Sequence, residues 1–170
     1  MLVTPLLARA TAFLIARWEL ATVIDVGAIE QDSDELNNHT VVIGVGRVGR
    51  EVAIRLQEAN RPYVCLDIDP HAIAVARQEE ISVYFGDATR PEVLEAVGLN
   101  RAQALVIAID DPRHAVQMMN LVKYILPNLT VYARARDAQH AKMLERAGAA
   151  STVPEVIPTA TQLADLAMKN

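Results

Sequence analysis

The chain has 170 residues, and this length predicts a single domain with no room for a second, large substrate domain. The composition is 52% hydrophobic and 22% charged, which excludes a wholly disordered or fibrous protein. A net charge of −5 argues against a nucleic-acid binder, because a phosphate backbone requires a dense basic face. The single cysteine, Cys65, excludes an internal disulfide and a zinc site with several cysteine ligands.

The first 20 residues form an apolar stretch that Arg9 and Arg17 interrupt. This stretch lacks the charged n-region of a signal peptide and the roughly 20 uninterrupted apolar residues of a spanning helix. We expect a helix, and three interpretations stay open: a soluble docking helix, an interfacial helix, or the end of a membrane helix cut by the chain boundary. Residues 21–38 are acidic and turn-prone, which predicts a solvated linker.

From residue 39 to 170 the pattern changes to short apolar runs that alternate with amphipathic stretches. Runs rich in Val and Ile predict strands that are buried on both faces of a sheet. These runs lie at 40–45, 63–68, 81–85, 104–109 and 130–133. A sixth strand is predicted near 151–153, and a last helix from about Thr159.

Between the predicted strands, apolar residues recur at helical spacing. The two clearest stripes are Val48, Val52, Leu56 and Ala59, and Ala115, Met119, Val122 and Leu126. Helix boundaries are marked by Asp69-Pro70, Asp111-Pro112, Pro91, Gly98, Asp137 and Gly148. Alternating strands and helices predict a doubly wound α/β fold, with a parallel sheet of about six strands and helices on both faces.

The first predicted strand runs into a glycine-rich segment, Gly44-Val45-Gly46-Arg47-Val48-Gly49, which matches G-x-G-x-x-G. It follows a strand, opens a helix and precedes a second strand that ends in an acid, which is the context of a Rossmann-like nucleotide site. Gly44 permits the tight turn, Gly46 lets the backbone approach a phosphate, and Gly49 lets the helix pack on the strand. The N–H groups of Arg47 and Val48 would then face an anion. The alternative is a glycine turn used for packing alone.

Two aspartates at the ends of neighbouring strands are candidate ligand contacts. Asp67 is placed to accept both hydroxyls of an adenosine ribose, and its charge would repel a 2′-phosphate. We therefore expect a ligand of the NAD or AMP type and not NADP. Asp87 could accept from the adenine amine with Ala88 lining the ring, or it could belong to a turn beside a capping box from Thr89 to Glu92.

Other polar residues give weaker signals. Asp110, Asp111 and His114 suggest a metal site, but helix capping by Asp111 explains them better, and they supply no convincing ligand set. No histidine lies beside a serine or cysteine nucleophile in the sequence, so no catalytic residue is predicted.

Arg134 and Arg136 are separated by two positions at the end of the fifth predicted strand, so they share a face at the edge where ligands bind. Their guanidinium groups could hold a phosphate or carboxylate, or they could form salt bridges with nearby acids. Both interpretations stay open at this stage.

Five segments in this order resemble the TrkA-N domain, the N-terminal lobe of regulators of potassium conductance. They are GVGRVG (44–49), LDID (66–69), VYFGDAT (83–89), LEAVG (94–98) and ARARD (133–137). The resemblance covers about residues 39–154. Within this family the chain is most similar to the cytosolic tails of Kef-type cation:proton antiporters, the glutathione-gated potassium-efflux systems. The segment VTPLL (3–7) and the acidic linker resemble the end of their last membrane helix.

The resemblance implies a regulatory domain that senses NAD(H) or AMP and passes ligand occupancy to a transmembrane antiporter or channel domain. It also implies a homodimer on the cytoplasmic side of the bacterial inner membrane, and glutathione as a further ligand that Arg134 or Arg136 would contact. The implied nucleotide contacts are Gly44, Gly46, Arg47, Val48 and Gly49 for phosphate, Asp67 for ribose, and Asp87 and Ala88 for adenine. Val45 and Ile68 complete the candidate site.

Two other functions compete with this one. An NAD-dependent oxidoreductase, or a fragment of one, would need a further domain to hold a substrate over the nicotinamide and an acid/base pair, and the sequence indicates neither. A stand-alone sensor that docks through its N-terminal helix is the third hypothesis. We therefore predict a binding domain and not an enzyme.

Overall fold

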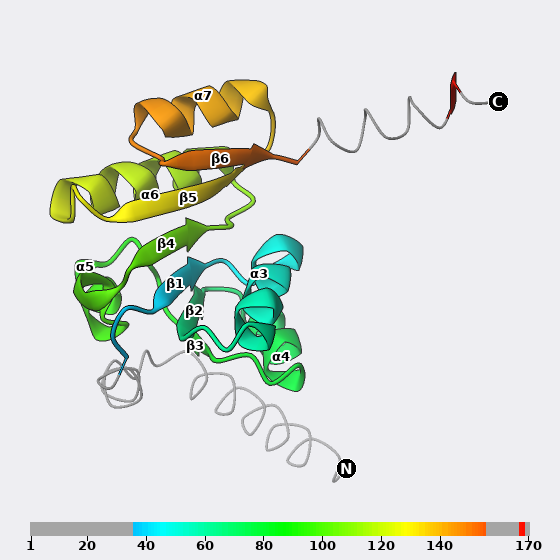
Figure 1. The fold of residues 1–170 in the computed structure, drawn as a ribbon, viewed down its shortest axis with the longest axis vertical. Helices are drawn as coiled ribbons and strands as arrows, with labels where there is room; N and C mark the ends of the chain where they lie inside the picture. Colours follow the sequence, from blue (N-terminus) through cyan, green and yellow to red (C-terminus); the bar gives the residue numbers. More distant parts are fainter. Residues whose placement is uncertain (1–35, 156–166, 169–170) are drawn as a thin grey trace, which may run out of the picture.

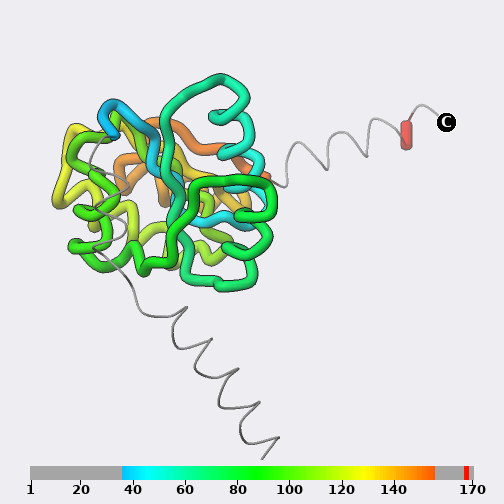
Figure 2. Tube along the Cα trace, turned by 90° about the horizontal axis from the view of Figure 1, so that it is seen from below, coloured from blue at the N-terminus to red at the C-terminus, as the bar shows by residue number. Residues whose placement is uncertain are grey.

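The computed structural model describes residues 36–155 and 167–168 (Figure 2). Six parallel strands form one sheet in the order β3-β2-β1-β4-β5-β6. The strands are β1 (Thr40–Ile43), β2 (Tyr63–Asp67), β3 (Val83–Phe85), β4 (Ala104–Ile107), β5 (Thr130–Ala135) and β6 (Ser151–Pro154). The strand order reverses between β1 and β4, so the predicted doubly wound α/β fold is confirmed.

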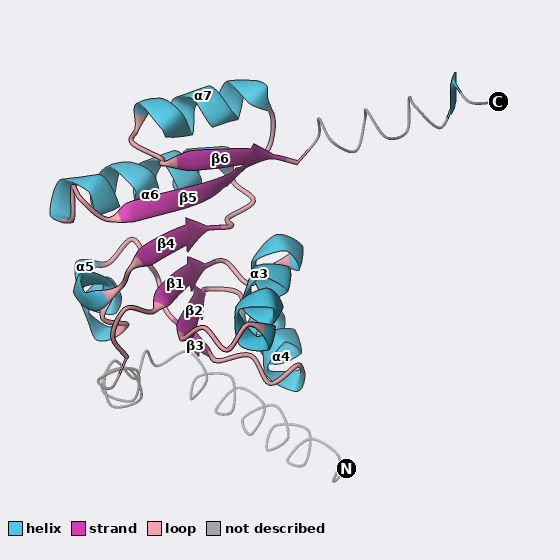
Figure 3. Ribbon diagram, in the orientation of Figure 1, coloured by secondary structure: helices cyan, strands magenta, loops and turns pink. Residues whose placement is uncertain are grey.

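The helices lie in two layers, one on each face of the sheet (Figures 1 and 3). The helices are α3 (Arg47–Glu58), α4 (Pro70–Gln78), α5 (Pro91–Ala96), α6 (Pro112–Ile125) and α7 (Ala138–Arg146), with a 3-10 turn at Leu99–Arg101. Helices α3 and α4 pack on β1, β2 and β3 around Val42, Ala53 and Ile73. Helices α5, α6 and α7 pack on the other face around a larger core that includes Leu105 and Met119.

Aspartate caps fix where three helices begin, as the sequence predicts. The carboxylate of Asp69 accepts the N–H of His71, that of Asp111 accepts the N–H groups of Arg113 and His114, and that of Asp137 accepts the N–H of His140. The turn that the sequence offers as one role for Asp87 is confirmed, but the capping box from Thr89 to Glu92 beside it is wrong. The residue before α5 is Arg90, and Thr89 instead donates its N–H and hydroxyl to Asp87.

The apolar stripes are confirmed in part on both α6 and α3. Ala115, Met119 and Val122 are buried, whereas Leu126 is half-buried and is the C-cap of α6, which ends at Ile125. Ala59 is exposed, against the prediction, because α3 ends at Glu58 and Ala59 is its C-cap. Cys65 is buried in the core, and burial raises the pKa of its thiol to about 12.

The predicted apolar helix over 1–20 lies outside the described residues. Of the last helix, predicted from about Thr159, only residues 167–168 are described, and they are helical. The predicted linker over 21–38 is described only from Leu36 onward. In the parts of the chain that the structure describes, no helix is long and apolar enough to cross a membrane.

A buried histidine, His39, lies directly before the first residue of β1. His39 is fully buried, its Nε2–H donates to the carbonyl of Val97 at 2.9 Å, and its Nδ1 has no hydrogen-bond partner among the described residues. Burial lowers the pKa of His39 below its ordinary value of 6.5, and the nearby charge of Arg101 lowers it further, whereas the hydrogen bond to Val97 acts in the opposite direction. The folded protein therefore favours the neutral imidazole.

This depressed pKa makes folding stability depend on pH. Well above pH 6.5 His39 is neutral in both states. As the pH falls through 6.5 the unfolded state takes up the proton first, so stability falls as the pH falls towards the folded-state pKa. The expected slope approaches about 1.4 kcal/mol per pH unit for one proton. Urea denaturation between pH 5 and 7 should give a flatter pH dependence for His39→Gln than for the wild type. Equal slopes would contradict this account of His39.

Candidate nucleotide-binding site

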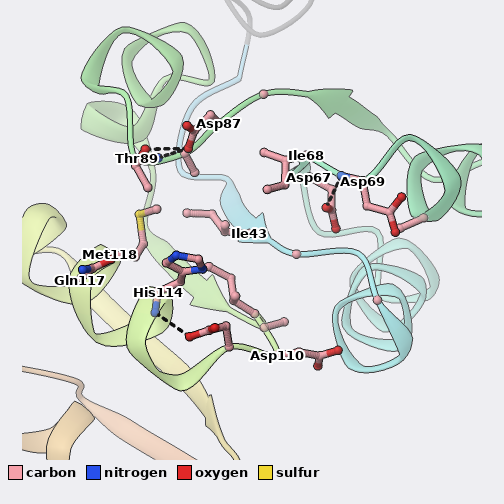
Figure 4. A pocket seen from close by; sticks show the side chains of 18 residues that line it. Ile43, Asp67, Ile68, Asp69, Asp87, Thr89, Asp110, His114, Gln117 and Met118 are labelled. Atoms are coloured by element: carbon pink, nitrogen blue, oxygen red, sulfur yellow. Dashed lines mark hydrogen bonds between the residues drawn. The ribbon is translucent and has the colours of Figure 1, made fainter. Parts of the chain in front are cut away.

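A cavity of about 490 Å³ opens at the carboxyl edge of the sheet, where the strand order reverses between β1 and β4 (Figure 4). Parallel α/β sheets bind their ligands at this position. The walls come from the glycine loop after β1, the ends of β2 and β3, the loop after β4 and the first turns of α6. The cavity therefore collects residues from four separate stretches of the chain, because the loop after β4 continues directly into α6.

Each of the three glycines of the loop occupies its position for a different structural reason. Gly44 adopts φ +91, where L side chains are strained, and a Cβ there would lie 3.1 Å from the carbonyl carbon of Ala108. A Cβ on Gly49 would lie 1.7 Å from the carbonyl oxygen of Gly44, so only glycine lets α3 approach the strand end this closely. Gly46 has no heavy atom within 4 Å of its Cβ position and therefore faces open space.

The start of α3 is suited to an anion. Gly46 is the N-cap of α3 and has no side chain that caps the first N–H groups. Gly46 also lines the cavity. The N–H groups of a helix start, together with the helix dipole, attract phosphate or carboxylate.

Asp67 joins the glycine loop to the end of β2. Its Oδ2 accepts the N–H of Val45 at 2.6 Å, and its Oδ1 accepts the N–H of Asp69 at 2.8 Å. Each carboxylate oxygen retains further acceptor capacity, so the side chain still has acceptor sites for hydroxyl groups of a ligand. The sequence predicts Asp67 as a ligand contact but not its second role, which is to fix the loop.

The end of β3 forms the opposite wall. Asp87 accepts both the N–H of Thr89, at 2.9 Å, and its hydroxyl, at 2.7 Å, so this aspartate closes a turn and lines the cavity at the same time. Ala88 lies beside it and is almost fully buried. Ile68, at the end of β2, is 62% exposed and lines the cavity with an apolar surface.

The twelve candidate residues divide into two groups. Gly44, Gly46, Asp67, Ile68, Asp87 and Ala88 line the cavity. The other six are not among the residues that line it: Val45, Arg47, Val48, Gly49, Arg134 and Arg136. Sequence reasoning did not single out Gln117 and Met118 of α6 as site residues, although both line the cavity, because no local signal shows which face of α6 meets the cavity.

Arg134 in β5 and Arg136 just after it are both ion-paired. Arg134 pairs with Asp110 and Glu155, and its side chain is only 12% exposed. Arg136 pairs with its neighbour Asp137 at 3.2 Å. Of the two interpretations left open by the sequence, the structure therefore displays the salt bridges.

Asp110 and Asp111 have separate structural tasks. Asp110 pairs with Arg134, and Asp111 caps α6. The N–H groups of His114 and Arg113 lower the pKa of Asp111 by stabilising its carboxylate. Within residues 36–155 and 167–168, no group of three His, Cys, Asp or Glu side chains is arranged to hold a metal ion.

The chain resembles solved structures of known ligand-binding domains. The AMP-bound form of the Shewanella denitrificans Kef CTD is 35% identical, with a TM-score of 0.68 over 78% of this chain and 80% of that one. The GsuK channel bound to NAD superposes with a TM-score of 0.69 over 78% of this chain and 23% of that one. Its identity of 23% supports likeness of fold alone.

Sequence comparisons lead to the same group of proteins. K(+) efflux antiporter 2, chloroplastic, of Arabidopsis thaliana is 37% identical over 164 residues, which are 96% of this chain and 14% of the antiporter. Glutathione-regulated potassium-efflux system protein KefC of Salmonella arizonae is 36% identical over 155 residues, or 91% of this chain and 25% of KefC. The chain thus spans a quarter or less of the length of these relatives. The TrkA-N domain model matches residues 40–155, and the chain belongs to the TrkA-N domain family.

Proposed function

We propose that this chain is the regulatory nucleotide-binding domain of a potassium efflux or cation:proton antiport system, and that it binds NAD(H) or AMP without turnover. The observation that carries this proposal is the junction of the glycine loop with Asp67, where an uncapped helix start and a carboxylate line one cavity. The AMP-bound Kef CTD, at 35% identity, supports an adenine nucleotide as the ligand.

Each part of the ligand has a proposed partner in the cavity. The phosphate would accept N–H groups at the start of α3, from Arg47 and Val48, where Gly46 leaves space. The ribose hydroxyls would donate to Asp67, whose charge disfavours a 2′-phosphate. The adenine would lie between Ile68 and the wall formed by Asp87 and Ala88.

We propose binding without catalysis because the lining carboxylates are already used as acceptors. Asp67, Asp87 and Asp111 each accept at least one backbone N–H, and for Asp111 the N–H groups of His114 and Arg113 lower the pKa of the carboxyl group. A general acid needs the opposite environment. The cavity therefore suits recognition of a ligand better than proton transfer to one.

The proposed partner is a transmembrane antiporter or channel domain on the cytoplasmic side of a bacterial inner membrane. The match to the chloroplast antiporter covers 96% of this chain, so it includes most of the first 38 residues, which we propose as the end of a membrane helix or a docking helix (1–20) and a linker (21–38). Residues 39–170 would form the sensing domain.

A homodimer is the proposed assembly. Tyr132 of β5 and Val153 of β6 are 45% and 66% exposed, and neighbouring apolar side chains of this kind favour burial against another surface.

Arg134 and Arg136, expected to contact glutathione, pair with carboxylates of this chain. We therefore leave glutathione out of the proposed ligands.

Replacing Asp67 tests the proposed ribose contact. Asp67→Ala is expected to weaken AMP binding by about 1 to 3 kcal/mol, because hydrogen bonds to a charged group are lost. It should also lower stability, since the N–H groups of Val45 and Asp69 lose their acceptor. Calorimetric titration and thermal unfolding measure the two effects.

Asp137→Ala is the matched control. It removes the cap of α7, outside the cavity lining, and should cost about 1 kcal/mol of stability with unchanged AMP affinity. If Asp67→Ala binds AMP as tightly as the control does, Asp67 is not a ligand contact.

A further inference from the structure

Four charged side chains meet beside the glycine loop, and we call them the edge cluster: Arg47, Asp110, Arg134 and Glu155. They come from the start of α3, the loop after β4, β5 and the residue after β6. The carboxyl ends of these strands lie along one edge of the sheet (Figure 1). Arg134 pairs with both Asp110 and Glu155, and Arg47 pairs with Glu155. The cluster carries two positive and two negative charges.

Glu155 is held firmly within this cluster. Its N–H donates to the carbonyl of Ala135 at 2.9 Å, which continues the pairing of β5 with β6. Its Oε2 accepts from Nε of Arg134 at 3.0 Å and from a second nitrogen of the same guanidinium group. Arg134, with its side chain 12% exposed, therefore acts as a positioning residue for Glu155.

Arg47 is held much more loosely. Its Nη2 lies 3.6 Å from Oε1 of Glu155, and its side chain is 84% exposed. An exposed ion pair of this length contributes little to stability and is easily exchanged for another anion. Arg47 is also the first residue of α3, so its backbone N–H belongs to the proposed phosphate site.

We propose that Glu155 competes with the ligand phosphate for the side chain of Arg47 and so sets the affinity of the site for phosphorylated adenosines. This inference rests on the proposed function. The side chain of Arg47 can turn either to Glu155 or to a phosphate at the helix start, and the Glu155 carboxylate repels that phosphate. Glu155 thus disfavours ligands in proportion to their phosphate charge, and it leaves an uncharged adenosine unaffected.

The competition also connects the site to the end of β6. Linkage is reciprocal, so a phosphate that draws Arg47 away weakens the hold on Glu155 by the same factor by which Glu155 weakens the phosphate. Glu155 retains its contacts with Arg134 in either state. Nucleotide occupancy would therefore change the electrostatic environment of the residue that follows β6.

Calorimetric titration of the 170-residue chain with AMP and with adenosine tests this inference. Glu155→Gln should bind AMP about two- to five-fold more tightly than the wild type, the range for an exposed ion pair, with unchanged adenosine affinity. The gain should shrink at 0.5 M salt because screening weakens the competition. In an Arg47→Gln background, Glu155→Gln should produce a smaller gain.

Two further variants keep the test decisive. Glu95→Gln makes the same charge change at an exposed position of α5, outside the cavity lining, and should leave both affinities unchanged. Glu155→Asp keeps a carboxylate beside Arg134 but shortens its reach to Arg47, so it should also bind AMP more tightly than the wild type. It serves as the test variant if Glu155→Gln does not fold.

An AMP affinity that is unchanged or weaker in both Glu155 variants would overturn the inference, as would an equal gain for AMP and adenosine. If the wild type binds AMP but neither Glu155 variant binds it more tightly, the result refutes the competition and leaves the proposed function standing. A wild type that binds neither AMP nor adenosine refutes the proposed function, and the competition with it.

Discussion

Gly49→Ala is expected to cost about 3 kcal/mol or more of folding stability, the upper end of the range for overpacking. A Cβ at residue 49 would lie 1.7 Å from the carbonyl oxygen of Gly44 and 2.9 Å from its carbonyl carbon. These are backbone atoms, so neither can turn aside as a side chain would. Chemical denaturation and thermal unfolding should detect the loss, with the melting temperature lower by about 10 °C.

Gly46→Ala is the matched control for this substitution, in the same loop. Gly46 adopts φ −62, which any residue tolerates, and its Cβ position has no heavy atom within 4 Å. We expect the stability of Gly46→Ala to stay within about 1 kcal/mol of the wild type. Equal losses in the two variants would show that close packing of α3 on the strand end does not explain Gly49.

Gly46→Asp should abolish nucleotide binding and leave the fold intact. The new side chain has space, and an aspartate at the N-cap position stabilises a helix, so stability should be equal to or above that of the wild type. Its carboxylate would occupy the place proposed for the phosphate and repel it. We expect AMP affinity to fall by at least roughly 100-fold in calorimetric titration, or about 2.7 kcal/mol.

Gly46→Asn separates the effect of charge from that of size. Asparagine has nearly the shape of aspartate and the same capping ability, without the charge. Gly46→Asn should weaken AMP binding less than Gly46→Asp does. A folded Gly46→Asp variant with wild-type AMP affinity would move the phosphate site away from the glycine loop.

Local signals in the sequence are sufficient to predict most of the fold. Asp69-Pro70 and Asp111-Pro112 mark helix starts because a cap and its proline are adjacent in the chain, and both helices begin there. The runs that contain β1 and β2 predict central strands because both strands are buried on two faces. The prediction for β5 stops at Ala133, but the strand continues to Ala135 because pairing with β6 extends it.

Contacts between distant residues are not predictable in the same way. Glu155 follows an edge strand and carries no motif, yet it pairs with Arg47 and Arg134 because the sheet order brings the ends of β6 and β5 beside the glycine loop. The bond from Val45 to Asp67 likewise depends on the final shape of the loop. The glycine spacing indicates the kind of site, and the sheet determines which charges surround it.

We propose that the junction of the glycine loop with Asp67 holds a phosphorylated adenosine. Calorimetric titration of the folded 170-residue chain with AMP, NAD and NADH tests this proposal. We expect saturable binding of at least one of them at one site per chain, with NADP binding far more weakly than NAD. A well-folded sample that gives no heat with any of these adenylates would contradict it.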